Sequence, residues 1–258
     1  MLRFKMLFKV TLKDMRENMK NKQISLVMIL LPATFTIMIP LLLIVLPLKL
    51  MSHEDLLEAG MLVPGLEGAE AYLVYNWNTI ILPFFVMVPL AITMSISSDS
   101  WAGEKERRTA ESLLLLPLTD EELFLAKVLA SLIPGLVITW ACGITLTIII
   151  DITMYPYLGY AFLPNASWLF HQLVLTPILA FFSIFINVWI SYRSKDTKSA
   201  QQMGGLVFLV FIGFLVGGFL GVITLLTYVI TLILGIIDII FIYISPKVFS
   251  RERIMINT

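Results

Sequence analysis

The sequence predicts an all-α integral membrane protein in which an amphipathic surface helix precedes six transmembrane helices. Three observations lead to this fold class: a low content of charged residues, a series of long apolar runs, and an uneven distribution of Lys and Arg. Of the 258 residues, 59% are hydrophobic and 14% are charged, whereas soluble domains have about 25% charged residues.

The apolar runs set the number of spans. A helix needs roughly 20 apolar residues to cross a bilayer. Four runs have the length of one crossing, and a fifth run is about twice as long and contains one charged residue, Asp238. We expect the fifth run to form two helices that turn near 221–227, with a re-entrant hairpin as the alternative. The expected spans are 24–48, 77–97, 129–150, 173–190, 205–223 and 227–245.

The positive charges predict the orientation of these spans. Arg193 precedes the fifth run and Lys247 follows it, and Lys and Arg are enriched on the cytoplasmic side of membrane proteins. Both flanks of the run are therefore expected inside, which requires an even number of crossings. Six spans place all but Lys49 of the 18 Lys and Arg residues in cytoplasmic segments and both termini in the cytoplasm.

Residues 1–23 form a separate segment before the transmembrane domain at 24–258. Basic and apolar residues recur there at helical spacing on roughly opposite sides, which predicts an amphipathic helix on the membrane surface with its basic side towards lipid headgroups. The basic stripe is Lys5, Lys9, Lys13, Arg16 and Lys20, and the apolar stripe is Phe4, Phe8, Met15 and Met19.

The segment between the second and third spans has the densest charge of the chain. Glu104 and Arg108, and Arg107 and Glu111, are spaced for i,i+4 pairs on a helix. Pro117 ends this helix because proline lacks the N–H that a helix interior needs. Thr119 and Glu122 predict a capping box that starts a new helix leading into the third span. The charged helix is either a solvated loop with its leucines on the membrane or a docking element for a soluble partner.

The same segment resembles a signature of type-2 permeases of ATP-binding-cassette transporters. One residue departs from the pattern, because Arg108 stands where many members have Gly. The basic segment 13–22 and the segment 191–205 are also similar to these permeases. The matching residues are Gly103, Glu104, Lys105, Glu106, Arg107, Thr109, Glu111, Leu113, Leu114, Pro117 and Lys127.

The resemblance implies that Glu104–Leu116 is a coupling helix seated on a separate nucleotide-binding subunit. It also implies two ATPase subunits, a second permease subunit (the same chain or a different one), export as the direction of transport, and the plasma membrane of a prokaryote. No nucleic-acid partner is implied. The expected partner-binding residues are Glu104, Lys105, Arg107, Arg108, Thr109, Glu111, Leu113, Leu114 and Pro117.

The sequence argues against an enzyme. It has no G-x-x-x-x-G-K-[ST] phosphate loop, so we expect no cofactor in this chain, and ATP and Mg²⁺ are expected on the partner subunit. Its two histidines, His53 and His171, are far apart, and Cys142 is its single cysteine, so neither a catalytic residue nor a metal site is expected. A channel or secondary transporter without ATP coupling, and a membrane scaffold, are the alternative functions.

Two features inside the spans are further candidates. Asp238 is an ionisable residue near the middle of the sixth span, which marks either a functional polar site or a contact that holds helices together. Asn187 is a candidate hydrogen-bond partner for it. Gly213, Gly217 and Gly221 repeat at every fourth position of the fifth span, and such rows allow helices to pack closely, either between two subunits or within one.

Overall fold

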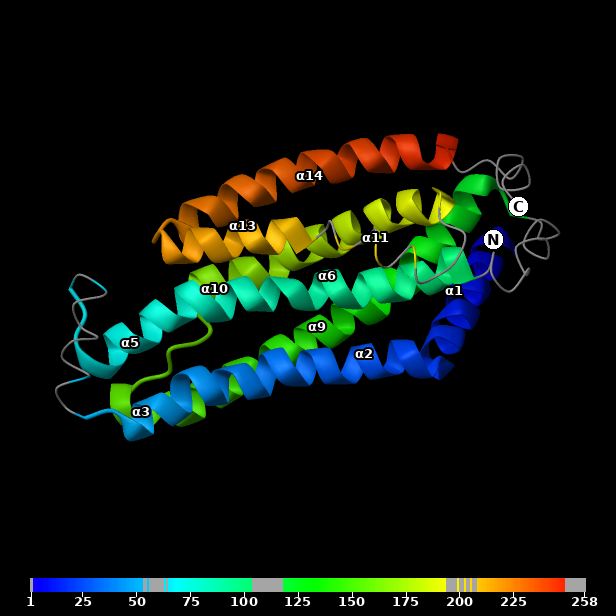
Figure 1. The fold of residues 1–258 in the computed structure, drawn as a ribbon. Coiled ribbons are helices and arrows are strands. Elements are labelled where there is room, and N and C mark those ends of the chain that lie inside the picture. Colours follow the sequence, from blue (N-terminus) through cyan, green and yellow to red (C-terminus); the bar gives the residue numbers. More distant parts are fainter. Residues whose placement is uncertain are drawn as a thin grey trace.

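A computed structural model describes residues 2–52, 55, 63, 65–103, 118–193, 199, 202, 205 and 208–248. Long helices lie side by side, and α1 crosses them at a steep angle at one end of the bundle (Figure 1). We call this end the α1 end, and the opposite end, where α3 and α5 lie, the α3 end.

The regular elements among the described residues are helical, and those labelled η are π-helical turns. They are α1 (Leu2–Lys20), α2 (Lys22–Ala33), η1 (Thr34–Met38), η2 (Leu41–Val45), α3 (Leu46–Leu50), α5 (Gly68–Asn76), η3 (Trp77–Ile81), α6 (Leu82–Ser98), η4 (Asp99–Gly103), α9 (Asp120–Leu158), α10 (Ala166–Phe170), η5 (His171–Leu175), α11 (Thr176–Arg193), α13 (Phe208–Phe219) and α14 (Ile223–Val248).

Five helical stretches among the described residues are long and apolar enough to cross a membrane. This agrees with an integral membrane protein. The predicted fifth span, 205–223, stays a prediction because α13 comprises 12 described residues. The five stretches are Ile24–Leu50, Gly68–Ser98, Asp120–Leu158, Ala166–Ser191 and Ile223–Ile244.

Several helices extend beyond the apolar runs from which they were predicted. The third begins at the capping box, which is confirmed: the Glu122 amide donates to Thr119 Oγ1 at 3.2 Å, and the Thr119 amide donates to Glu122 Oε2 at 2.8 Å. It ends at Leu158, beyond the predicted limit of 150, where Gly159 takes a left-handed conformation with φ of 73°. Charged and tyrosine residues at the helix ends lower the local hydropathy but do not interrupt the helix.

Four π-helical turns share one position relative to proline. The turns η1, η2, η3 and η5 each end two residues before a proline. Proline lacks an N–H, and its ring clashes with the carbonyl one turn earlier. A local widening to the π pattern accommodates this clash without breaking the span. The prolines are Pro40, Pro47, Pro83 and Pro177.

The second and fourth spans form the centre of the bundle. In the most apolar part of Gly68–Ser98, 78% of the residues are buried, and in that of Ala166–Ser191 the share is 61%. Aromatic rings connect these spans near the α3 end, where the rings of Trp77 and Trp168 pack edge to face with their centroids 5.2 Å apart. The first and fifth stretches, Ile24–Leu50 and Ile223–Ile244, are each 22% buried and therefore lie at the periphery.

The helices α13 and α14 form a hairpin at residues 220–222, which overlaps the start of the predicted turn at 221–227. Gly221 has a φ of 70°, a conformation that favours glycine. The amide of Val222 donates to the Gly217 carbonyl at 3.0 Å and closes the end of α13.

Helix α1 has a third face that the two-sided pattern did not predict. Lys9, Lys13 and Lys20 are exposed, and Phe8 and Met19 are also exposed. The placement of this helix at a membrane surface stays a prediction. Between these stripes lies a buried face that contacts α9 and η4 and contains three polar side chains. These are Thr11, Asp14 and Asn18.

Candidate functional site

The nine residues predicted to bind a partner lie outside the described residues. They are Glu104, Lys105, Arg107, Arg108, Thr109, Glu111, Leu113, Leu114 and Pro117. The structure does describe what joins each end of this segment: η4, which ends at Gly103, and Leu118 with Thr119, which lead into α9. Both junctions lie at the α1 end of the bundle.

Polar side chains connect α1 and the residue that follows it to η4. Asn18 Nδ2 donates to Ser100 Oγ at 3.5 Å, and Asn21 Nδ2 donates to Asp99 Oδ1 at 3.1 Å. Asn18, Asp99 and Ser100 are each at most 6% exposed. Hydrogen bonds in such a poorly solvated place are costly to leave unmade, so they fix α1 against η4.

Lys127 links η4 to α9. Its side chain is 1% exposed, and Nζ donates to the Ser100 carbonyl at 2.6 Å. A buried ammonium is costly unless it is hydrogen-bonded and compensated by negative charge. Two buried carboxyl groups lie on the adjoining elements, that of Asp14 on α1 and that of Asp99 on η4. We call Asn18, Asn21, Asp99, Ser100 and Lys127 the base cluster.

The other junction is held by apolar contacts. Leu118 is 5% exposed and belongs to a small core with Leu7 and Val10 of α1 and Leu123 and Ala126 of α9. Thr11 strengthens this contact, because its hydroxyl lies 3.2 Å from the Ala126 carbonyl. Helix α1 therefore packs against the described residues on both sides of the segment 104–117.

Asn187 extends the polar contacts to the fourth span. This residue of α11 is fully buried, and its Nδ2 lies 2.8 Å from the Met94 carbonyl and 2.7 Å from both Ser97 Oγ and Ser98 Oγ. All three acceptors are on α6, directly before η4. A second bond, from Ser183 Oγ to the Leu90 carbonyl at 2.9 Å, joins the same two helices.

The structure does not bring Asp238 and Asn187 together in a hydrogen bond. Asp238 is 6% exposed on α14, and neither of its carboxyl oxygens has a hydrogen-bond partner among the described residues. The hydroxyl of Thr227, on the same helix as Asp238, donates to the Ile223 carbonyl at 2.8 Å.

The three glycines of the predicted row have different surroundings. A Cβ at Gly217 would lie 2.3 Å from Leu226 Cδ2, so this glycine allows α13 to approach α14. Gly221 makes the turn, and Gly213 faces open space. Gly218, which the row did not include, comes closest to the backbone of another helix, because a Cβ there would lie 2.8 Å from the Asn78 carbonyl oxygen.

Sequence reasoning missed most of the base cluster. Lys127 was recognised as part of a motif, but Asn18, Asn21, Asp99 and Ser100 were not. The signal was present in α1, because Thr11, Asp14 and Asn18 recur at three- and four-residue intervals along one face. Among the described residues there is no group of three or more His, Cys, Asp or Glu that could hold a metal ion.

The fold defines a multi-pass α-helical membrane protein that carries the base cluster at its α1 end. The sequence model of the ABC-2 family transporter proteins matches residues 8–249. The chain therefore belongs to the ABC-2 transporter family and is of the class that forms the membrane subunit of an ATP-binding-cassette transporter, which is not the ATPase. Comparisons with curated proteins and with solved structures found no match.

Proposed function

We propose that the chain is the membrane-spanning subunit of an ATP-driven exporter and that its segment 104–116 docks on a separate ATPase subunit. The observation that supports this is the attachment of both ends of the segment to the bundle. The base cluster joins η4 to α1 and α9, and the contacts of Leu118 join the start of α9 to α1. A displacement of the segment would therefore move α1, η4 and α9 together.

Coupling requires that the partner bind two arrangements of the spans with different free energies. When ATPase subunits close, they would displace the docked segment and with it α1, η4 and α9. The bonds of Asn187 and Ser183 between α6 and α11 would then carry the displacement into the fourth span. The polar contacts make these elements respond together.

The proposed assembly contains two permease subunits and two ATPase subunits. The chain would cross the plasma membrane of a prokaryote six times, with both termini and the α1 end in the cytoplasm. ATP and Mg²⁺ would bind to the partner, and this chain would hold no cofactor. The export direction rests on the resemblance of the segment 98–130 to type-2 permeases.

Affinity purification of the chain from its native membrane, followed by mass spectrometry, tests this function. We expect a soluble subunit with a phosphate-loop ATPase domain to be recovered with the wild type. Glu104→Ala and Arg107→Ala should each lose this subunit while the chain stays folded and inserted. Lys49→Ala, which lies at the α3 end, is the control and should retain it. Recovery of the chain alone, or undiminished ATPase binding by both variants, would contradict the proposal.

A further inference from the structure

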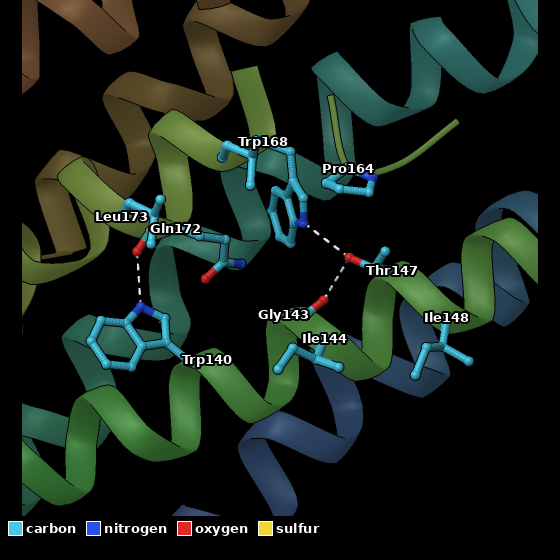
Figure 2. Close-up of a pocket in the computed structure, with 10 residues that line it drawn as sticks. Trp140, Gly143, Ile144, Thr147, Ile148, Pro164, Trp168, Gln172 and Leu173 are labelled. Atoms are coloured by element: carbon cyan, nitrogen blue, oxygen red, sulfur yellow. Dashed lines mark hydrogen bonds between the residues drawn. The ribbon is translucent and has the colours of Figure 1, made fainter. Parts of the chain in front are cut away.

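A groove lies between the third and fourth spans, away from the α1 end. It has a volume of about 320 Å³ and is bounded by α9 on one side and by α10 and η5 on the other. Figure 2 shows Trp140, Gly143 and Thr147 on the α9 side, facing Trp168 and Gln172. From Trp140 to Ile148 the groove follows α9 for about 12 Å, given the rise of a helix.

Two indole rings form walls whose positions are fixed. Trp140 Nε1 donates to the backbone carbonyl of Gln172 at 2.9 Å, and Trp168 Nε1 donates to Thr147 Oγ1 at 3.0 Å. Trp168 also packs edge to face against Trp77 and Phe85. Because both indole N–H groups are engaged within the protein, the rings offer apolar surface to the groove.

The side chain of Gln172 is the exception in this apolar lining. It is 8% exposed, and neither its amide nitrogen nor its amide oxygen has a hydrogen-bond partner among the described residues. Figure 2 shows it pointing from η5 towards α9 at Gly143. A Cβ at Gly143 would lie 2.2 Å from Gln172 Nε2, so glycine makes the room that this amide occupies.

The local backbone is consistent with a binding role. Gln172 is in the π-helical turn η5, and such turns inside helices are frequent at functional sites. A buried amide with an unused donor and an unused acceptor is unfavourable unless a ligand supplies the missing partners. A hydroxyl or an amide can donate to the amide oxygen and accept from the nitrogen.

The surroundings of the groove define the rest of the ligand. Ile144 is 63% exposed and Leu173 is 64% exposed at its edge, in helices that are apolar enough to cross a membrane, so the groove opens towards lipid. None of its lining residues is charged, and an unpaired charge would be costly there. Its volume is near the lower end of ligand pockets, which span roughly 300–1,000 Å³, so it suits a single chain.

We propose that this groove binds a neutral amphiphile from the bilayer: one apolar chain lies against Trp140 and Trp168, and its hydroxyl or amide group pairs with the Gln172 amide. Binding requires a rearrangement of the Gln172 side chain by a small rotation, because its amide atoms are covered in this structure. The site requires insertion in a membrane but does not depend on ATP coupling.

Photolabelling of the purified full chain in lipid nanodiscs tests the site. The probe is a medium-chain primary alcohol with a diazirine in mid-chain, and the comparison probe is the matched alkane without the hydroxyl. Labelled residues are mapped by mass spectrometry at increasing probe concentration, with and without excess unlabelled alcohol. No ATPase is present, so this result is independent of whether the chain is ATP-coupled.

We expect saturable labelling at Ile144, Thr147 and Leu173 that the unlabelled alcohol removes. Ile144→Trp should abolish it by filling the groove, whereas Val137→Trp, an exposed position two turns earlier on the same face of α9, should not. Gln172→Leu should weaken alcohol labelling by about fivefold, as the loss of a hydrogen bond predicts, and leave alkane labelling unchanged.

Two results would overturn the proposal. Labelling that rises linearly with probe and is equal in Ile144→Trp and Val137→Trp would mean that the groove is ordinary lipid-facing surface. Equal labelling by alcohol and alkane, unchanged in Gln172→Leu, would remove Gln172 from ligand recognition and with it the assigned ligand class.

Discussion

Asn187 and Asp238 are both buried polar residues of membrane-spanning helices, but their surroundings differ. Asn187 is in a central span, and its amide nitrogen lies within hydrogen-bond distance of three acceptors on α6, whereas its amide oxygen has no partner among the described residues. Asp238 is in the peripheral α14, and its carboxyl oxygens have no hydrogen-bond partner among the described residues. Polarity alone therefore does not reveal what a residue contributes, because its hydrogen-bond partners decide whether it stabilises the subunit.

The contrast extends to the spans around them. The central spans are joined by side-chain hydrogen bonds near the α1 end, whereas α14 offers a mainly apolar, exposed surface. In a membrane there is no hydrophobic force between helices, so packing and hydrogen bonds determine which helices stay together. We therefore expect the central polar contacts to stabilise this subunit and the α14 surface to remain available to lipid or to another subunit.

Lys127→Met should have the largest effect on stability, because it removes a buried ammonium group that donates a hydrogen bond. We expect a loss of about 3 kcal/mol in the free energy of unfolding, because the buried Ser100 carbonyl loses its charged hydrogen-bond donor. Chemical unfolding in detergent micelles measures this loss. Lys127→Arg keeps the charge and should recover much of the lost free energy of unfolding. An arginine variant as unstable as Lys127→Met would show that the shape of the side chain matters more than its charge.

Asn187→Leu should have the second-largest effect. We expect the free energy of unfolding to fall by about 2 kcal/mol, because hydrogen bonds between α6 and α11 are lost. The thermal unfolding midpoint of the solubilised chain measures it. Thr145→Val is the control: this exposed hydroxyl donates to the Ala141 carbonyl within its own helix, and its loss should change little. A drop for Thr145→Val as large as that for Asn187→Leu would refute the special role of the central contacts.

Asp238→Leu should act in the opposite direction and by a smaller amount. Removing a buried carboxyl group without a described partner should stabilise the isolated subunit by about 1 kcal/mol. The same unfolding measurement applies, with Asp238→Asn as the polar control of similar shape. Destabilisation by Asp238→Leu would show that the carboxyl group has a partner and would remove the difference between the two residues.

Tyr160→Phe should have the smallest effect. The Tyr160 hydroxyl donates to Glu70 and connects the α9–α10 loop to α5. This hydrogen bond raises the pKa of Tyr160 above its usual value of 10.0. A raised pKa contributes stability below about pH 10 that is lost as the pH rises through the folded-state pKa.

Because the Tyr160 pair is exposed, its contribution should be only a few tenths of a kcal/mol, roughly the size of a surface pair. Wild type and Tyr160→Phe should therefore differ slightly at neutral pH and converge in alkali. Unfolding titrations at several pH values measure the difference in free energy of unfolding between the two proteins. A difference that grows above pH 10 would contradict the proposed contribution of the Tyr160 hydroxyl.

The sequence allowed the membrane class, the apolar runs and the Thr119–Glu122 capping box to be predicted, because each depends on residues close together in the chain. The π-helical turns were not predicted. Their positions depend on how the helix backbone adjusts to the hydrogen bond that proline cannot donate, and a hydropathy pattern contains no information about this adjustment.

The site was predictable to a lesser extent. The motif identified the segment 104–117 and Lys127, but the contacts of Asn18 with Ser100 and Asn21 with Asp99 join residues about 80 positions apart. The helical periodicity of α1 predicts a helix on a membrane surface. It does not predict which helix packs against the polar face of α1. The same holds for Gln172, whose missing partners become evident only after α9 is placed beside η5.

The central claim is that the contacts of α1 with η4 transmit the motion of a docked ATPase. The direct measurement is ATP hydrolysis by the assembled complex in nanodiscs, with the double variant Asn18→Ala, Asn21→Ala compared with Glu17→Ala, Met19→Ala at exposed positions of the same helix. We expect both complexes to assemble, with the permease accelerating hydrolysis in the control but not in the Asn18, Asn21 variant. Equal, wild-type acceleration in both would contradict the claim.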